Sequence, residues 1–287
     1  MRMFFLIALL FIYGNSFAQE IDTENSNSWV FQDIIPGGHR GRVNIIQNDG
    51  ERLLSAGEDG FLEIWDLTRR QAVLRFQLTG LPIISMVCRP GKKEIACIES
   101  DGLGQYRISV WDYGVQRNLF TLRFRDPVRS VSYSAGGNFL IITRSGSTGI
   151  VLTDPETGEL LLDPRNISPD FPSSVSFAVI GRTERTMLVY SPMGNLSYWE
   201  LRREGTLQLL PSMDSSARPV NFNIPAELSS PVLFGNNRFF AGFAGRELVI
   251  LRADTGEEIA RDSFPSTGTL IAGGEELYCL LAEGVHR

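Results

Sequence analysis

Lysine and histidine are scarce in this chain of 287 residues. Only two of its 27 basic residues are lysines, Lys92 and Lys93, and its two histidines are His39 and His286. The formal net charge is −6 at pH 7. This charge argues against a non-specific binder of nucleic acid or of anionic membranes, because both need a cationic face. Arginine carries nearly all the positive charge, either through codon bias or because its planar fork reads carboxylates and phosphates.

With two histidines, catalytic and metal-binding clusters are hard to assemble. We expect His286 to be a solvated residue next to the chain end, and the sequence offers no Ser-His-Asp, Cys-His or histidine–metal cluster. The glycine-rich segments 101–104 and 146–149 neither open a helix nor end in Gly-Lys-Ser/Thr, so they do not predict a phosphate cradle. We therefore expect no enzyme, no catalytic residue, no cofactor and no metal site.

Cysteine is also rare, and the three cysteines form an odd set. In an oxidising compartment at least one thiol would stay unpaired within the monomer. Cys88 and Cys97 flank the turn 89–93, so they either face each other across a hairpin and form a disulfide, or are two small buried hydrophobes. We favour two buried thiols.

Long apolar runs are absent except at the N-terminus. Residues 1–18 have a positive Arg2, an apolar stretch from Phe4 to Tyr13 and the small-residue ending Ser16-Phe17-Ala18, which predicts a signal peptide cleaved after Ala18. Residues 19–28 are polar and predict a flexible leader. We expect an exported protein, periplasmic or secreted, without integral membrane insertion after cleavage.

A repeat organises the rest of the chain, residues 29–287. Short alternating apolar runs are separated by Gly, Asp, Asn and Pro turns, which predicts strands. Five self-similar segments begin near residues 43, 84, 128, 175 and 232, and their anchor pairs lie about 42 to 52 residues apart, a spacing that suits one four-stranded blade. These pairs are Trp65-Asp66, Trp111-Asp112, Thr153-Asp154, Trp199-Glu200 and Leu251-Arg252. The sequence therefore predicts an all-β propeller of four-stranded antiparallel blades.

The first repeat resembles the WD-repeat family. It carries Gly38-His39, the turn Glu58-Asp59-Gly60 and the pair Trp65-Asp66. The resemblance implies a buried, hydrogen-bonded tetrad of His39, Ser55, Asp59 and Trp65, so His39 is expected to be structural. Other repeats depart from the pattern, with Leu81 in place of the histidine, Thr153 in place of the tryptophan and Leu251-Arg252 in place of the final pair.

The resemblance also implies that an N-terminal strand closes the ring, and Trp29 to Ile35 is placed to do so. About five to six blades are recognisable. The last blade has residues for strands at 269–272 and 276–282, with little left for a third. We expect either a sequence truncated from a longer protein, which we favour, or an incomplete blade with an edge open to pairing.

We expect a scaffold for protein–protein interaction, because WD-repeat relatives mostly act this way and loops on a rigid body carry specificity. Its partners would be proteins or peptides, with no nucleic acid. One alternative is a propeller enzyme or small-ligand binder with a site at the central channel, and another is the sensor half of a longer protein. Arginines near the expected outer strands or loops of the blades are either solvated charge or an interaction rim: Arg69, Arg70, Arg123, Arg125, Arg202 and Arg203.

Overall fold

The structure is a computed structural model that describes 38–49, 52–69, 71–145, 149–180, 183–192, 196–211, 228–234, 239–252, 257–273, 276–281 and 284–286. The predicted signal peptide, the leader, the closing strand Trp29–Ile35 and Arg70 lie outside these residues. By its contacts the chain divides into two compact units. The larger unit holds the described residues of 39–65 and 73–223, and the smaller one holds Gly38 and the described residues of 66–72 and 224–287.

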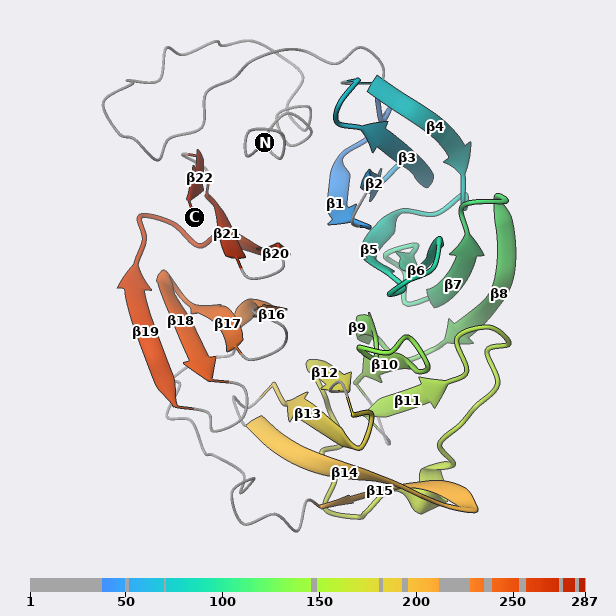
Figure 1. The fold of residues 1–287 in the computed structure, drawn as a ribbon, viewed down its shortest axis with the longest axis vertical. Helices are drawn as coiled ribbons and strands as arrows, with labels where there is room; N and C mark the ends of the chain where they lie inside the picture. The colour runs from blue at the N-terminus through green and yellow to red at the C-terminus, as the bar shows by residue number, and fades with distance from the viewer. Residues whose placement is uncertain are drawn as a thin grey trace. The chain divides into compact units, whose positions relative to one another are not determined.

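Within the described residues the fold is an all-β propeller with six antiparallel sheets (Figure 1). Blade 1 is β1 (Val43–Asn48), β2 (Leu53–Gly57), β3 (Phe61–Asp66) and β4 (Gln71–Gln77). Blade 2 is β5 (Ile83–Cys88), β6 (Glu94–Ser100), β7 (Tyr106–Asp112) and β8 (Arg117–Phe124). Blade 3 is β9 (Val128–Tyr133), β10 (Leu140–Arg144) and β11 (Ile150–Thr153). Blade 4 is β12 (Phe177–Ile180), β13 (Thr186–Tyr190), β14 (Leu196–Glu204) and β15 (Thr206–Pro211).

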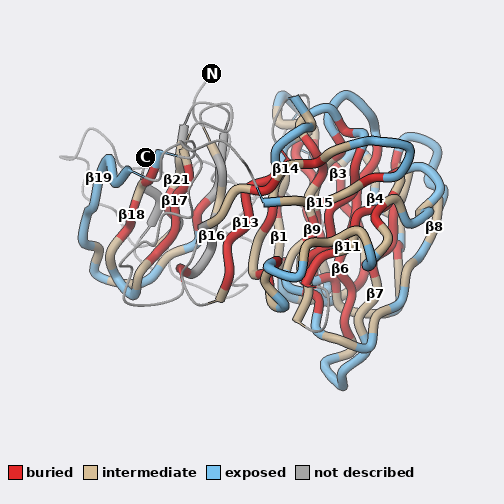
Figure 2. Tube along the Cα trace, turned by 90° about the horizontal axis from the view of Figure 1, so that it is seen from below, coloured by how far each residue is buried: buried red, intermediate tan, exposed pale blue. Residues whose placement is uncertain are grey.

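In the larger unit the first strands of successive blades contact one another in the series β1, β5, β9 and β12 (Figure 1). The outer strand β4 alternates between exposed and half-buried residues along its length, while β2 and β6 are buried throughout. Figure 2 shows this contrast, with red along second strands such as β6 and tan and pale blue along outer strands such as β8. The alternation follows from the period of two in a strand, because an outer strand turns one face to its neighbouring blade and the other to water.

Three hydrophobic clusters hold neighbouring blades of the larger unit face to face. Blades 1 and 2 share the cluster of Leu54, Leu62, Ile64, Met86 and Ile95, all fully buried. Blades 2 and 3 share the cluster of Ile98, Ile108, Val110, Leu140 and Ile142, and blades 3 and 4 share the cluster of Ile141, Leu152, Ala178, Val189 and Leu209. Each blade buries apolar side chains on both faces, so blade-to-blade packing supplies the core.

Blade 3 has three strands where the sequence predicted four. After β11 the chain makes one isolated bridge, Thr153 to Leu160, and then turns into the short 3-10 helix η2 (Pro164–Asn166). The segment that follows β11 contains Pro155, Pro164, Pro169 and Pro172. Because proline has no N–H to donate to a ladder, this segment does not extend the sheet.

The smaller unit contains blade 5, with β16 (Ser229–Phe234), β17 (Phe239–Ala244), β18 (Glu247–Arg252) and β19 (Glu258–Ser263). It also contains a three-stranded sheet of β20 (Thr269–Gly273), β21 (Glu276–Leu281) and β22 (Gly284–His286). The sequence left little room for the third of these strands, but three residues are enough for β22. Phe243 packs edge-on against Phe264 in the core of this unit, with ring centroids 5.9 Å apart.

Candidate functional site

Most of the predicted repeat anchors lie at or directly after the end of a third strand. Trp65-Asp66 ends β3 and Trp111-Asp112 ends β7, whereas Asp154 follows β11 and Trp199 lies within the longer β14. Asp66, Asp112 and Asp154 each accept backbone N–H bonds from the residues two and three positions later, at 2.8–3.2 Å. Such a bond stabilises the turn that leaves the strand. These aspartates are turn formers.

The structure brings His39, Ser55, Asp59 and Trp65 together in what we call the His39 cluster. His39 Nδ1 lies 2.9 Å from Asp59 Oδ1 and its Nε2 lies 2.8 Å from Ser55 Oγ, while the Trp65 indole N–H donates to Ser55 Oγ at 2.8 Å. A neutral imidazole that donates through Nδ1 and accepts from the Ser55 hydroxyl satisfies every polar atom in this chain of bonds. The cluster therefore fixes the segment before β1 onto β2 and β3.

Asp59 is held in this cluster as a carboxylate. Burial alone would raise its pKa, but the hydrogen bonds from His39 and from the backbone N–H groups of Arg40 and Phe61 keep the pKa below its ordinary value. Because the unfolded chain then binds the proton more tightly than the folded one, this carboxylate stabilises the fold above its unfolded pKa. Its contribution is lost as the pH falls through the lower, folded-state pKa.

The turn that carries Asp59 requires a glycine. Gly60 has φ +71°, and a Cβ at this position would lie 2.2 Å from the carbonyl oxygen of Thr79. The Gly60 carbonyl accepts the backbone N–H of Leu78 at 2.9 Å and that of Thr79 at 3.2 Å. The turn between β2 and β3 is thereby fixed to the segment that leaves β4.

An ion pair between a buried glutamate and a partly exposed arginine stands beside the His39 cluster. Glu63 on β3 is fully buried, and its Oε1 accepts Arg75 Nε from β4 at 2.8 Å. Arg75 also lies 3.5 Å from Asp59 Oδ2 and stacks over the Phe61 ring at 3.8 Å. Glu63 Oε2 has no hydrogen-bond partner among the described residues and lies 3.9 Å from His39 Nε2. We call these two residues the Glu63–Arg75 pair.

Blade 2 repeats the tryptophan but lacks the hydroxyl beneath it. Leu53 pairs with Trp65 and Ile95 with Trp111, so Cys97 takes the place that Ser55 has in blade 1. Within the described part of the chain, the buried Trp111 Nε1 has no hydrogen-bond partner. In blade 4 the Trp199 indole donates instead to Ser197 on its own strand, at 2.9 Å.

Because Trp65 has a hydrogen-bond acceptor and Trp111 lacks one among the described residues, we expect replacement by phenylalanine to destabilise the fold more at Trp65 than at Trp111. We expect Trp65→Phe to lower the free energy of unfolding by about 1–3 kcal/mol more than Trp111→Phe, because only Trp65 loses a hydrogen bond and leaves Ser55 unsatisfied. Urea denaturation at pH 7 followed by circular dichroism measures both. Equal losses in the two variants would show that the bond to Ser55 adds no stability.

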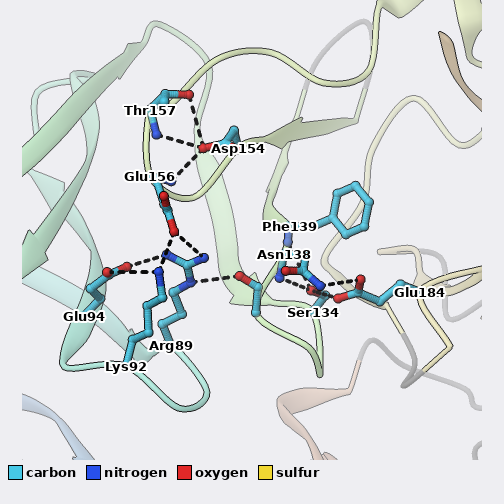
Figure 3. Close-up of polar contacts among 11 residues, drawn as sticks. Arg89, Lys92, Glu94, Ser134, Asn138, Phe139, Asp154, Glu156, Thr157 and Glu184 are labelled. Atoms are coloured by element: carbon cyan, nitrogen blue, oxygen red, sulfur yellow. Dashed lines mark hydrogen bonds and ion pairs between the residues drawn. The ribbon is translucent and has the colours of Figure 1, made fainter. Parts of the chain in front are cut away.

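Polar links join neighbouring blades of the larger unit. Between blades 1 and 2, Tyr113 O–H donates to Asp49 Oδ2 at 2.7 Å, and burial together with this bond raises the pKa of Tyr113. Between blades 3 and 4, Glu184 accepts from Ser134 Oγ at 2.6 Å and from Asn138 Nδ2 at 2.9 Å (Figure 3). These contacts connect turns that follow the first or third strand of a blade.

The link between blades 2 and 3 is a charged network around Arg89 (Figure 3). The buried guanidinium of Arg89 donates to Gly137 O at 2.8 Å and to Glu94 Oε2 at 2.6 Å, and it lies 3.4 Å from Glu156. Lys92 also pairs with Glu156, and these two cations hold the pKa of Glu156 below its ordinary value. Arg89 and Lys92, in the hairpin between β5 and β6, therefore both have ion-pair partners within the protein.

The arginines of the predicted rim lie on separate blades and differ in their pairing. Arg69 is exposed beside Asp66, while Arg202 on β14 lies 3.3 Å from Glu200 and Arg203 lies 5.9 Å from the Phe139 ring. Arg123 and Arg125 are exposed and, among the described residues, neither has a carboxylate within 4 Å. Arg123 and Arg125 are therefore the least engaged of the described members of the predicted set, and the interaction rim stays a prediction.

The turn between β6 and β7 stands beside these two arginines. Asp101 Oδ1 accepts the backbone N–H groups of Leu103 at 2.8 Å and Gln105 at 3.2 Å, and Ser100 Oγ accepts that of Gly102. Leu103 itself is 90% exposed. Tyr106, which begins β7 directly after the turn, pairs with Phe124, the last residue of β8, and Arg125 follows. We call Leu103, Arg107, Arg123 and Arg125 the blade 2 corner.

The three cysteines are free thiols. The register opposes Met86 to Cys97 and Cys88 to Ile95, so Cys88 and Cys97 do not face each other across the hairpin. Burial raises the pKa of Cys88 to about 12 and that of Cys279 to about 11, and it raises the pKa of Cys97 as well.

Raised pKa values predict slow thiol chemistry, because the thiolate is the nucleophile. At pH 8 we expect the native chain to resist iodoacetamide at Cys88, Cys97 and Cys279, and the urea-unfolded chain to take up three labels. Intact-mass spectrometry against time follows both reactions. A native chain that alkylates as fast as the unfolded one, or whose mass shows an oxidised cysteine pair, contradicts this prediction.

Among the described residues, no group of His, Cys, Asp and Glu could hold a metal ion. No helix in the described part of the chain is long and apolar enough to cross a membrane.

Comparison with known proteins agrees with this architecture. Residues 18–276 match the model of the family TP_0598_N, described as an N-terminal beta-propeller domain. An uncharacterized protein of Treponema pallidum (strain Nichols) is 24% identical over 216 residues, which are 75% of this chain and 32% of that protein. This chain thus spans about a third of the length of that relative.

The beta-propeller domain of Cps50 (Swd1) from Myceliophteria thermophila has a similar fold, with a TM-score of 0.63 and 14% identity over 87% of this chain and 83% of that one. Because the family model matches most of the sequence, the chain belongs to the TP_0598_N family of N-terminal beta-propeller domains.

Proposed function

We propose that this chain is an exported propeller of the WD-repeat kind that serves as a binding platform for partner proteins or peptides. The bonds within the His39 cluster, on the residues of the WD-type tetrad, support the family assignment. The apolar stretch from Phe4 to Tyr13 supports export. Propeller domains commonly mediate protein interactions, and the fold itself favours this role.

One observation carries the proposal. The turn from Asp101 to Gln105 holds its backbone in place through the Asp101 carboxylate, yet it presents Leu103 to water at 90% exposure. A fixed turn loses little conformational entropy on binding, and an apolar side chain displayed in this way gains free energy when a partner covers it. Loops on a rigid scaffold are where binding residues concentrate.

The test compares two exposed leucines. The full chain with a C-terminal tag is expressed in the organism from which it comes and cross-linked to its partners. The tagged chain is then recovered, and the proteins retained with it are identified by mass spectrometry. We expect Leu103→Asp to lose partners that the wild type retains, whereas Leu160→Asp, at a position 56% exposed in blade 3, keeps them. A wild type that recovers nothing above background, or partner sets that do not change with Leu103→Asp, would overturn the proposal.

A further inference from the structure

We propose that the blade 2 corner binds an acidic segment of a partner protein, one that carries Asp or Glu side chains next to an apolar residue. This inference rests on the proposed function and names the chemistry of the partner.

Three charged side chains form a row across the strands of blade 2. The register places Glu99 on β6 opposite Arg107 on β7, and Arg107 opposite Arg123 on β8. Glu99 is buried, accepts a hydrogen bond from the Ser109 hydroxyl and lies 3.5 Å from Arg107 Nε. Its charge is therefore used within the sheet by Arg107. Arg123 stands next in the row and has no carboxylate within 4 Å among the described residues.

This row affects the stability of blade 2. Two like charges directly opposite each other in an antiparallel pair destabilise the sheet. Arg123 therefore gives blade 2 no evident stabilisation, and the cost of placing it opposite Arg107 is compensated when a partner supplies a carboxylate. Arg125 follows β8 directly, in the bend that leaves the strand, and is also exposed.

The nearby carboxylates of the chain do not fill this role. Asp126 lies 3.4 Å from Arg144, and the Asp101 carboxylate accepts backbone N–H groups of its own turn. On a chain with a net charge of −6, two exposed guanidiniums without an ion pair form a local cationic site. A guanidinium binds a carboxylate through two parallel hydrogen bonds, so an acidic side chain fits this geometry.

The position of Leu103 distinguishes a polypeptide from other anions. Leu103 is at the tip of the turn, and the Tyr106–Phe124 pair brings the base of that turn to the end of β8, within a few residues of Arg125. At about 3.3 Å per residue, the leucine and the two arginines are within reach of one short peptide. A leucine exposed beside arginines matches a partner that offers both carboxylates and an apolar side chain, which free phosphate and nucleic acid do not.

The experiment uses a defined probe and a matched control. A fluorescein-labelled twelve-residue peptide of alternating Glu and Leu is titrated with the full chain, and binding is followed by fluorescence anisotropy in low and high salt. We expect Arg123→Glu/Arg125→Glu to weaken binding at least tenfold, and Arg117→Glu, also exposed but at the other end of β8, to change it less than twofold. A Lys-Leu peptide and a twelve-nucleotide RNA are expected not to bind.

A second readout separates binding from folding. Arg123→Glu places a carboxylate opposite Arg107, so we expect an unchanged or higher midpoint of thermal unfolding together with weaker binding. An absence of binding to the Glu-Leu peptide, equal binding by the charge-reversed variant, or equal binding of the RNA overturns the proposal. If cellular partners depend on Leu103 but survive Arg123→Glu/Arg125→Glu, the acidic partner is wrong while the proposed platform function stands. If neither change affects them, both fail.

Discussion

Replacement of Arg75 by methionine is expected to lower the free energy of unfolding by about 3–5 kcal/mol, because it leaves Glu63 as a buried charge without its cation. Glu63 is fully buried, and Arg75 Nε is the donor to its Oε1 at 2.8 Å. The substitution also removes a cation near Asp59 and the guanidinium that stacks over Phe61. Urea denaturation at pH 7, monitored by circular dichroism, measures the loss.

Two variants make this result specific. Arg69→Met removes an arginine that is 71% exposed and lies 3.6 Å from Asp66, so we expect a change below about 1 kcal/mol. Glu63→Leu/Arg75→Met removes both charges and is expected to recover most of the stability that Arg75→Met alone loses, since a buried ion pair is often replaceable by apolar residues. A double variant as unstable as the single one would show that Arg75 acts through packing and not through charge.

Arg89→Met is expected to cost about 3 kcal/mol and to loosen blade 3 against blade 2. Arg89 is buried, and its loss leaves the carbonyl of Gly137 and the largely buried carboxylate of Glu94 without their donor. Hydrogen exchange should then quicken in the turn between β9 and β10. The measurement is exchange followed by mass spectrometry, together with a denaturant titration.

Lys92→Met is the matched control for this prediction. Lys92 is half-exposed and pairs with Glu156, whose side chain is 58% exposed, so the change should cost less than about 1 kcal/mol. If Arg89→Met and Lys92→Met behave alike, the network in Figure 3 is a surface feature and not a link between blades.

The strand boundaries of the propeller were largely predictable, because they depend on short-range patterns. The pairs Trp65-Asp66 and Trp111-Asp112 end β3 and β7, since an aspartate that accepts the following backbone N–H groups stops a strand locally. Blade 3 deviated where four prolines follow β11. The prolines are visible in the sequence, but whether a segment joins a sheet also depends on the strand that it can pair with in the folded protein.

The candidate site was less predictable, because it depends on which strands lie opposite each other. Arg202 and Arg123 look equivalent along the sequence, yet Arg202 lies beside Glu200 whereas Arg123 lies opposite Arg107. The Arg89 network joins residues far apart in the chain, and no local pattern indicates that Arg89 reaches Gly137. In the sequence Leu103 is one apolar residue in a turn. Its exposure is a feature of the folded turn that the hydrogen bonds of Asp101 hold in place.

The links between blades also bear on the order in which the chain assembles. Each blade forms from strands adjacent in sequence, whereas Tyr113 and Asp49, Lys92 and Glu156, and Ser134 and Glu184 are separated by 50 to 64 residues. Contacts of such separation require closure of a long loop, which is slow compared with the formation of a hairpin. During synthesis, the hydrogen bond between Asp49 and Tyr113 can therefore form only after the third strand of blade 2 has been made. Formation of these links therefore marks a late stage of folding. A chain whose synthesis halts before that stage would expose these polar turns, without their partners, to chaperones and proteases.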